Sequence, residues 1–277
     1  CSGLYPVEHC WLGWDCYYPK IDKTVTVFLN REAGTTKPAA DYPVAKTLCP
    51  YQSLVEQIRE NSGQAYSLIP FEEPYPGTFE EISDGIERLT KRPGKKYIYA
   101  YWPEPDGCMH EKGCYSPEAK ENLRQLEKQV QQLTEKLSNT LVIVTADHGH
   151  MDSRGVAIED YPKITDCLKR GLSLEPRAVN FFVKEEKKQQ FEEEFRKNFG
   201  DTFLLLTKEE VREKQLFGPG KEGAAFDGML GDYLAAAGSD LSIYSHKKEA
   251  DFFIGVHAGL LEDEMVIPLI LIGKDEL

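Results

Sequence analysis

Side chains of the types that bind metal ions gather at positions 145–152, where the chain reads Thr-Ala-Asp-His-Gly-His-Met-Asp. The acidic and imidazole side chains there are Asp147, His148, His150 and Asp152. The stretch follows the apolar run Leu141–Val144, and it holds two of only six histidines in the chain. Gly149 permits the sharp backbone turn that adjacent ligands need. The simpler alternative is a solvated polar turn after a buried strand.

A second polar cluster contains Asp106 and His110, which are four residues apart. On a turn of helix, residues at this spacing lie on the same face, so both side chains can face one point. A carboxylate and an imidazole suit Zn²⁺ or Mn²⁺. Alone the pair is a weak signal, because loops are rich in polar residues.

A third candidate is His257, in Gly255-Val256-His257-Ala258-Gly259. Its small neighbours let the backbone come close to a ligand or a metal ion. A single histidine has many uses, including structural ones, and only a convergent set indicates a site.

The elements around these clusters predict that they meet. Lys96–Trp102 reads as a strand. A helix follows from Ser116 and Pro117, a favourable N-cap and first helical residue, and an apolar stripe ends at Leu137. Thr140–Thr145 is the next strand. Strand, helix, strand with short links predicts a parallel pair, whose carboxyl ends share one edge of a sheet.

The remaining pattern predicts an α/β fold. Predicted helices are Ser53–Glu60, Phe79–Leu89, Glu185–Phe199 and a segment after the capping box at Thr207–Glu210. Predicted strands are Thr24–Asn30, Val179–Lys184, Phe203–Leu206 and Met265–Ile272. The last is continuously apolar, which is typical of a strand covered on both faces. We expect a mostly parallel sheet between helices.

Composition limits the function classes. The 277 residues fit one large α/β domain or two, and 41% are apolar. The net charge of −13 argues against a nucleic-acid polymer as partner, although bound cations would still admit phosphorylated substrates. No apolar run is long enough to span a bilayer. The seven cysteines include no C-x-x-C pair, which favours a reducing, cytoplasmic location. The terminal Lys-Asp-Glu-Leu matches a retrieval signal, which we take as coincidence.

Taken together, the clusters offer about what two divalent ions need. The candidate ligands are Asp106, His110, Asp147, His148 and His257. Two neighbouring divalent ions suit the hydrolysis of phosphoryl or sulfuryl esters.

The order of these motifs resembles the alkaline phosphatase superfamily, and within it the type I phosphodiesterase/nucleotide pyrophosphatase family. The matching patterns are D-x-x-x-H at 106–110, D-H-G at 147–149 and G-x-H-x-G at 255–259. The opening segment Ser2–His9 is similar to the family's T-G-x-Y-P-x-x-H-G, with Cys10 in place of the last glycine.

The resemblance implies roles for the candidate residues. Asp106, His110 and His257 would hold one ion, and Asp147 and His148 part of another. The ions would most often be Zn²⁺, and Mn²⁺ is possible. The fold would be one alkaline phosphatase-like domain over 1–277 with inserted cap segments at 20–95 and 185–250. His150 and Asp152 remain open between orienting a ligand and forming a solvated turn.

The resemblance also implies a departure. The family's remaining ligand, an Asp, and its Thr or Ser nucleophile lie upstream of the T-G-x-Y-P segment, and no residue of this chain matches either. The expected function is metal-dependent hydrolysis of a small phosphorylated or nucleotide substrate, with the 277-residue chain itself inactive or nearly so. Alternatives are a phosphomonoesterase, phosphonate hydrolase, sulfatase or phosphomutase, or a non-catalytic metal-binding fragment. The cysteines lack the C-x-P-x-R pattern of sulfatases.

Side chains near the motifs leave smaller questions open. The aromatic residues Trp11, Trp14, Tyr17 and Tyr18 could stack on a nucleobase or simply pack. Cys108 and Cys114 flank His110, and we expect them to be bystanders.

Overall fold

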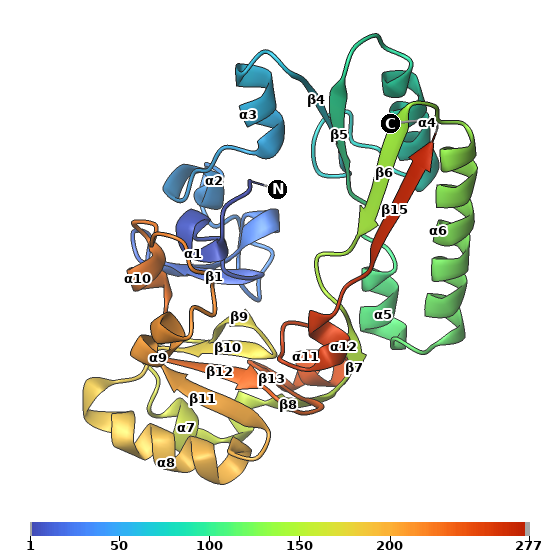
Figure 1. Ribbon diagram of the computed structural model, residues 1–277. Coiled ribbons are helices and arrows are strands. Elements are labelled where there is room, and N and C mark those ends of the chain that lie inside the picture. Colours follow the sequence, from blue (N-terminus) through green and yellow to red (C-terminus); the bar gives the residue numbers. More distant parts are fainter. Residues whose placement is uncertain (1, 275–277) are drawn as a thin grey trace. The chain divides into compact units, whose positions relative to one another are not determined.

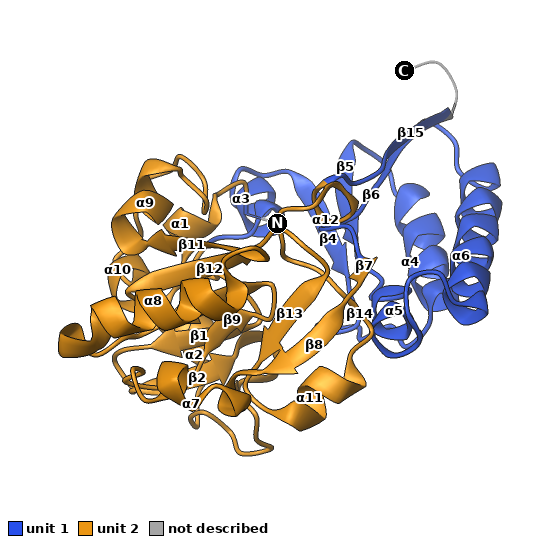
Figure 2. Ribbon diagram, turned by 90° about the horizontal axis from the view of Figure 1, so that it is seen from below, with its two compact units in different colours: residues 1–2, 52–150, 266–277 blue, residues 3–51, 151–265 orange. Residues whose placement is uncertain are grey.

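The computed structural model describes residues 2–274, and the chain divides into two compact units (Figures 1 and 2). Unit 1 comprises Cys1–Ser2, Gln52–His150 and Val266–Leu277, and unit 2 comprises Gly3–Tyr51 and Met151–Met265. Most of the terminal Lys-Asp-Glu-Leu motif lies outside the described residues.

Unit 1 contains two pairs of strands. β4 (Gln64–Leu68) and β5 (Lys96–Ala100) are parallel, whereas β6 (Thr140–Thr145) and β15 (Leu269–Lys274) are antiparallel. Within the described residues β5 and β6 do not pair with each other, so the predicted parallel pairing of these two strands is wrong. β6 pairs instead with β15, which returns from the far end of the chain.

The helices of unit 1 follow local signals in the sequence. They are α3 (Leu54–Glu60), α4 (Phe79–Thr90), α5 (Asp106–Lys112) and α6 (Pro117–Glu135). The predicted caps are confirmed: Ser53 and Ser116 accept hydrogen bonds from the backbone N–H groups of Glu56 and Ala119. The apolar face of α4 packs on β4 and β5 through Ile82, Leu89 and Leu68.

Unit 2 is built on a seven-stranded sheet in the order β11-β12-β10-β9-β1-β2-β3 (Figure 1). In chain order its strands are β1 (Asp15–Tyr18), β2 (Lys23–Thr26), β3 (Arg31–Glu32), β9 (Ser173–Glu175), β10 (Ala178–Phe181), β11 (Phe203–Thr207) and β12 (Tyr233–Ala237). Every pairing in this sheet is antiparallel. Helices and strands alternate along the chain, so the α/β class is confirmed, but the main sheet is not the mostly parallel one expected. Short links such as that between β9 and β10 produce hairpins, which parallel pairs cannot use.

Two smaller strand pairs complete unit 2. β8 (Arg154–Ala157) and β13 (Leu241–Tyr244) are parallel, and β7 (Met151–Asp152) and β14 (Gly255–Val256) are antiparallel. The α-helices are α1 (Pro6–His9), α2 (Val44–Leu48), α7 (Pro162–Thr165), α8 (Lys188–Phe199), α9 (Lys208–Glu213), α10 (Phe226–Met229), α11 (Lys247–Phe252) and α12 (Glu262–Met265). Short 3₁₀ turns are η1 (Val27–Leu29), η2 (Ile158–Asp160) and η3 (Glu185–Lys187).

The core of unit 2 depends on α8. Phe191, Phe195 and Phe199 recur every four residues along this charged helix and are buried against Phe181 and Phe203. The capping box before α9 is confirmed, because Thr207 and Glu210 exchange hydrogen bonds.

Two predicted strands differ from the structure by more than their end residues. The segment Thr24–Asn30 is a strand only to Thr26 and then turns into η1. The terminal apolar run begins within α12 and becomes β15 only at Leu269, and Leu269 and Leu271 are 69% and 61% exposed. An apolar run does not specify what covers it, so the expected burial on both faces is wrong for these residues.

The predicted single domain and its cap segments stay predictions. Residues 20–51 and 185–250 belong to unit 2, and residues 52–95 belong to unit 1. Over the described residues, no helix has the length and apolar character needed to cross a membrane.

Candidate metal centre

Helix α5 presents the first two candidate ligands. Asp106 opens the helix directly after Pro105, and His110 follows one turn later, so both side chains lie on one face. Asp106 Oδ1 and His110 Nε2 are 3.4 Å apart. The two side chains lie together as their spacing predicted, and their role as ligands stays a prediction.

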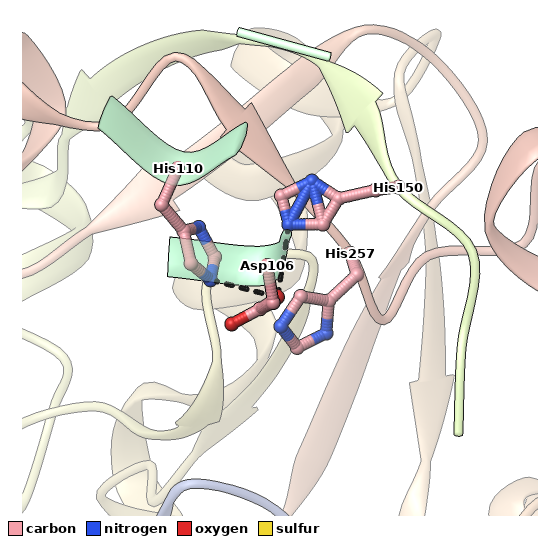
Figure 3. Close-up of side chains that lie close together, drawn as sticks. All are labelled: Asp106, His110, His150 and His257. Atoms are coloured by element: carbon pink, nitrogen blue, oxygen red, sulfur yellow. Dashed lines mark ion pairs between the residues drawn. The ribbon is translucent and has the colours of Figure 1, made fainter. Parts of the chain in front are cut away.

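His150 joins them from the turn that follows β6. Its Nε2 lies 3.2 Å from Asp106 Oδ1, and its ring centroid is 4.7 Å from that of His110. The side chain of His150 is 7% exposed. Asp106, His110 and His150 each offer one ligand atom, and these atoms lie within 4.8 Å of one another (Figure 3).

This donor set fits a divalent metal ion. Bonds to Zn²⁺ of about 2.0–2.1 Å at tetrahedral angles place neighbouring ligand atoms about 3.4 Å apart. The separations of 3.4 and 3.2 Å from Asp106 Oδ1 are close to that value. Asp106 Oδ1 is buried and accepts no hydrogen bond from any residue the structure describes, so its lone pairs are left for another partner.

The electrostatics of Asp106 reflect its surroundings. Burial raises the pKa of its carboxyl, and the charge of Asp147 acts in the same direction. His110 and His148 oppose this shift. A cation at the site would favour the ionised carboxylate, as metal ligation requires.

Asp147 and His148 form a second pair of candidate ligands next to the first. Asp147 Oδ1 and His148 Nε2 are 3.7 Å apart, and the His148 ring centroid is 6.0 Å from that of His150. His148 Nδ1 lies 2.9 Å from the Gly149 carbonyl oxygen, which can only accept a hydrogen bond. This contact places a ring proton on Nδ1, which is the tautomer that leaves Nε2 as the ligand atom when a histidine binds a metal ion.

The two remaining sequence candidates belong to unit 2. His257 follows β14, and the turn after it is fixed by Gly259, whose N–H donates to Glu264 Oε1 at 2.7 Å. Asp152 lies in β7 with an exposed side chain. The roles predicted for His257 and Asp152 stay predictions.

The family model of type I phosphodiesterase/nucleotide pyrophosphatase matches residues 5–259. The chain belongs to this family. The match begins within the T-G-x-Y-P-like segment and ends at Gly259, so it spans the motif around His257 as well as the candidate ligands of unit 1. The resemblance drawn from the sequence motifs is confirmed.

Solved structures of phosphodiesterase-family proteins share the fold. Murine ectonucleotide pyrophosphatase/phosphodiesterase 5, solved as an inactive variant in complex with AMP, is 18% identical with a TM-score of 0.69. Its human counterpart is 17% identical with a TM-score of 0.70. In both comparisons the alignment covers 98% of this chain and 74% of the other. No curated protein sequence matches the chain significantly.

Two further side chains of this phosphodiesterase-family chain interact with residues of the cluster without having been predicted to do so. Cys114 Sγ is 3.5 Å from His150 Nδ1, although the sequence led us to expect a bystander. Burial raises the pKa of the Tyr101 hydroxyl to about 12, and the carboxylates of Asp147 and Asp106 act in the same direction. The position of Tyr101 just after β5 was the available signal, because sites collect at the carboxyl ends of strands.

Proposed function

We propose that the chain carries the metal centre of a phosphoric ester hydrolase that acts on small nucleotide-type substrates. The observation that carries the proposal is the convergence of Asp106, His110 and His150, with Asp147 and His148 beside them, in a member of a phosphodiesterase family. Two adjacent sets of oxygen and nitrogen ligands suit two divalent ions.

The proposed ligands are those that the sequence motifs indicated. Asp106, His110 and His257 hold one ion, and Asp147 and His148 hold part of the other. Zn²⁺ fits the mixed carboxylate and imidazole set best, and Mn²⁺ is the second choice. When bound, such ions polarise the phosphoryl oxygen and lower the pKa of a coordinated nucleophile.

The assignment of His257 has support from backbone pairing within unit 2. Val256 of β14 pairs with Met151 of β7. His257 directly follows Val256, and His150 directly precedes Met151 in the chain. The pairing of β14 with β7 within unit 2 therefore supports the proposal that His257 is a ligand.

The protein's own charges explain why a cation is needed. The chain has a net charge of −13, and the carboxylates of Asp106 and Asp147 both lie at the site. An anionic phosphate ester would be repelled there unless bound cations reversed the local sign.

Nucleotides are the proposed substrate class, because the family is a nucleotide pyrophosphatase family and a related structure holds AMP. The nucleophile is proposed to be a Thr or Ser that is not among the 277 residues, since none of them matches the family pattern. The reducing, cytoplasmic location inferred from the cysteines stays a prediction.

Calorimetric titration with AMP tests this function. The 277-residue chain should bind AMP when it is loaded with Zn²⁺ and should not bind AMP when it is metal-free. Asp106→Ala should not bind AMP in either condition. Asp84→Asn, which removes an exposed acid on α4, is the matched control and should bind as the parent does. AMP binding that ignores the metal would contradict the proposed function.

Hydrolysis of bis-p-nitrophenyl phosphate tests the nucleophile separately. The 277-residue chain should turn this diester over little or not at all, even with Zn²⁺ bound. Turnover at enzymatic rates would show that the nucleophile lies within these residues.

A further inference from the structure

We propose that His150 is a metal ligand in its own right and that the Cys114 thiol holds its imidazole in the ligating orientation. Neither residue belongs to the ligand set that the motifs indicated. The proposal deepens the proposed function and rests on it, because both concern the same ion.

The first support is the placement of the His150 ring. Its side chain is 7% exposed, and its Nε2 lies 3.2 Å from Asp106 Oδ1. This separation matches the 3.4 Å between Asp106 Oδ1 and His110 Nε2, and both are close to the edge of a tetrahedron of zinc ligands. Each imidazole thus offers its Nε2 at a similar distance from the same carboxylate oxygen (Figure 3).

The second support is that the short approach is not a hydrogen bond. Asp106 Oδ1 accepts none from any described residue, although two ring nitrogens come near it. A buried carboxylate oxygen without a hydrogen bond is costly unless another group compensates it. A cation shared by Asp106, His110 and His150 provides that compensation.

The third support is the contact behind the ring. Cys114 Sγ lies 3.5 Å from His150 Nδ1, within the longer range of hydrogen bonds to sulfur. If Nε2 binds the metal ion, the ring proton is on Nδ1 and points at the sulfur. Histidine ligands usually donate their other N–H to an acceptor, which fixes the ring and its tautomer.

Asp106, His110 and Cys114 all come from one short segment, and His150 comes from another. α5 carries Asp106 and His110, and Gly113 ends the helix with φ +90, a conformation that favours glycine. Cys114 follows at once. The end of α5 therefore places the thiol where it can orient the ring that arrives from β6.

In the alternative arrangement, His150 is not a ligand, and its ring proton is on the other nitrogen. If His150 only positions Asp106, its Nε2 carries the proton and donates to the carboxylate, and Nδ1 accepts from the Cys114 thiol. The two arrangements are distinguished by which nitrogen is protonated in the zinc-loaded chain.

Nitrogen-15 NMR of the imidazoles in the intact 277-residue chain shows directly which nitrogen of His150 carries the proton. On adding Zn²⁺, His150 should show a proton on Nδ1 and a metal-shifted Nε2. A proton on Nε2 of zinc-loaded His150 would overturn the proposal. This measurement needs no variant, so it stands even if substitutions impair folding.

Variants of the same chain give a second readout through Co²⁺ absorption and chelator competition for Zn²⁺. His150→Ala should change the intensity of the Co²⁺ bands and weaken Zn²⁺ binding about 100-fold or more, and Cys114→Ala should weaken it about 10-fold. Cys114→Ser should recover part of the loss. Cys108→Ala, which removes the other thiol near His110, should change neither.

The outcomes separate this proposal from the proposed function. Unchanged Co²⁺ bands and unchanged Zn²⁺ affinity in His150→Ala would overturn the ligand role alone. A zinc site that depends on His150 but binds no AMP would contradict the proposed function and leave the ligand role standing.

Discussion

Arg177 and Glu264 form a fully buried ion pair in unit 2. Arg177 Nε and Nη2 donate to the two carboxylate oxygens at 2.5 and 2.6 Å, and the side chains are 0% and 1% exposed. Glu264 Oε1 also accepts from the N–H of Gly259. The pair thereby anchors the turn that follows His257, a role that explains why two charges are buried here.

Removing one partner of this pair should be costly. We expect Arg177→Met to lower the free energy of unfolding by about 3–5 kcal/mol, because the Glu264 carboxylate is left buried and uncompensated. Urea denaturation followed by circular dichroism measures this loss. The double variant Arg177→Met with Glu264→Leu should lose less than the single one, and an equal or larger loss would contradict the explanation.

The stability of unit 2 should fall when a buried phenylalanine of α8 is made smaller. Phe195 is fully buried and contacts Phe181, Phe191 and Phe199. Phe195→Ala should cost about 3–5 kcal/mol in the free energy of unfolding, because it leaves a cavity among these rings, whereas Phe195→Leu should cost less. Thermal and urea unfolding both report it. Similar losses for the two variants would show that cavity size does not determine the cost.

The contact between His246 and Glu159 should make stability depend on pH. The hydrogen bond that His246 Nδ1 donates to Glu159 Oε2 at 2.9 Å raises the pKa of His246 above its ordinary value, and Glu249 acts in the same direction. The stabilisation is full below the unfolded pKa of about 6.5 and is lost as pH rises through the folded pKa. His246→Gln should therefore destabilise the protein more at pH 6 than at pH 8.5. The measurement is urea denaturation at both pH values, and equal losses would refute the linkage.

Zinc should stabilise the chain through unit 1. Ligand that binds only the folded state raises stability by about 4 kcal/mol at a thousand times its Kd. We expect Zn²⁺ to raise the thermal midpoint of the parent chain and not that of His110→Ala. Differential scanning calorimetry with and without a chelator shows the difference. His246→Gln, which removes an exposed histidine far from α5 in sequence, should respond to Zn²⁺ as the parent does.

Local parts of the fold could be predicted because local residues determine them. Ser116 and Pro117 start α6. The four-residue spacing of Asp106 and His110 predicted that their side chains would lie close together. The partner of β6 could not be predicted in this way. Its apolar residues fit either direction of pairing, and β15 lies more than a hundred residues further along the chain.

The candidate site was likewise predictable only where local residues determine it. The residue types in Asp147-His148-Gly149-His150 indicated a metal site, but spacing alone could not say which imidazole faces Asp106. That depends on how the turn after β6 directs the His150 ring, and on Cys114 behind it. Neither contact has a sequence pattern, because both form between segments that are separated in the chain.

The most direct test of the metal centre is the zinc content of the purified 277-residue chain after dialysis against buffer without metal. Plasma mass spectrometry should find about one equivalent of Zn²⁺ or more in the parent and in Asp84→Asn, and far less in Asp106→Ala. Equal zinc contents in Asp106→Ala and the parent would contradict the account. So would a parent chain that is loaded with Zn²⁺ before the dialysis and retains none.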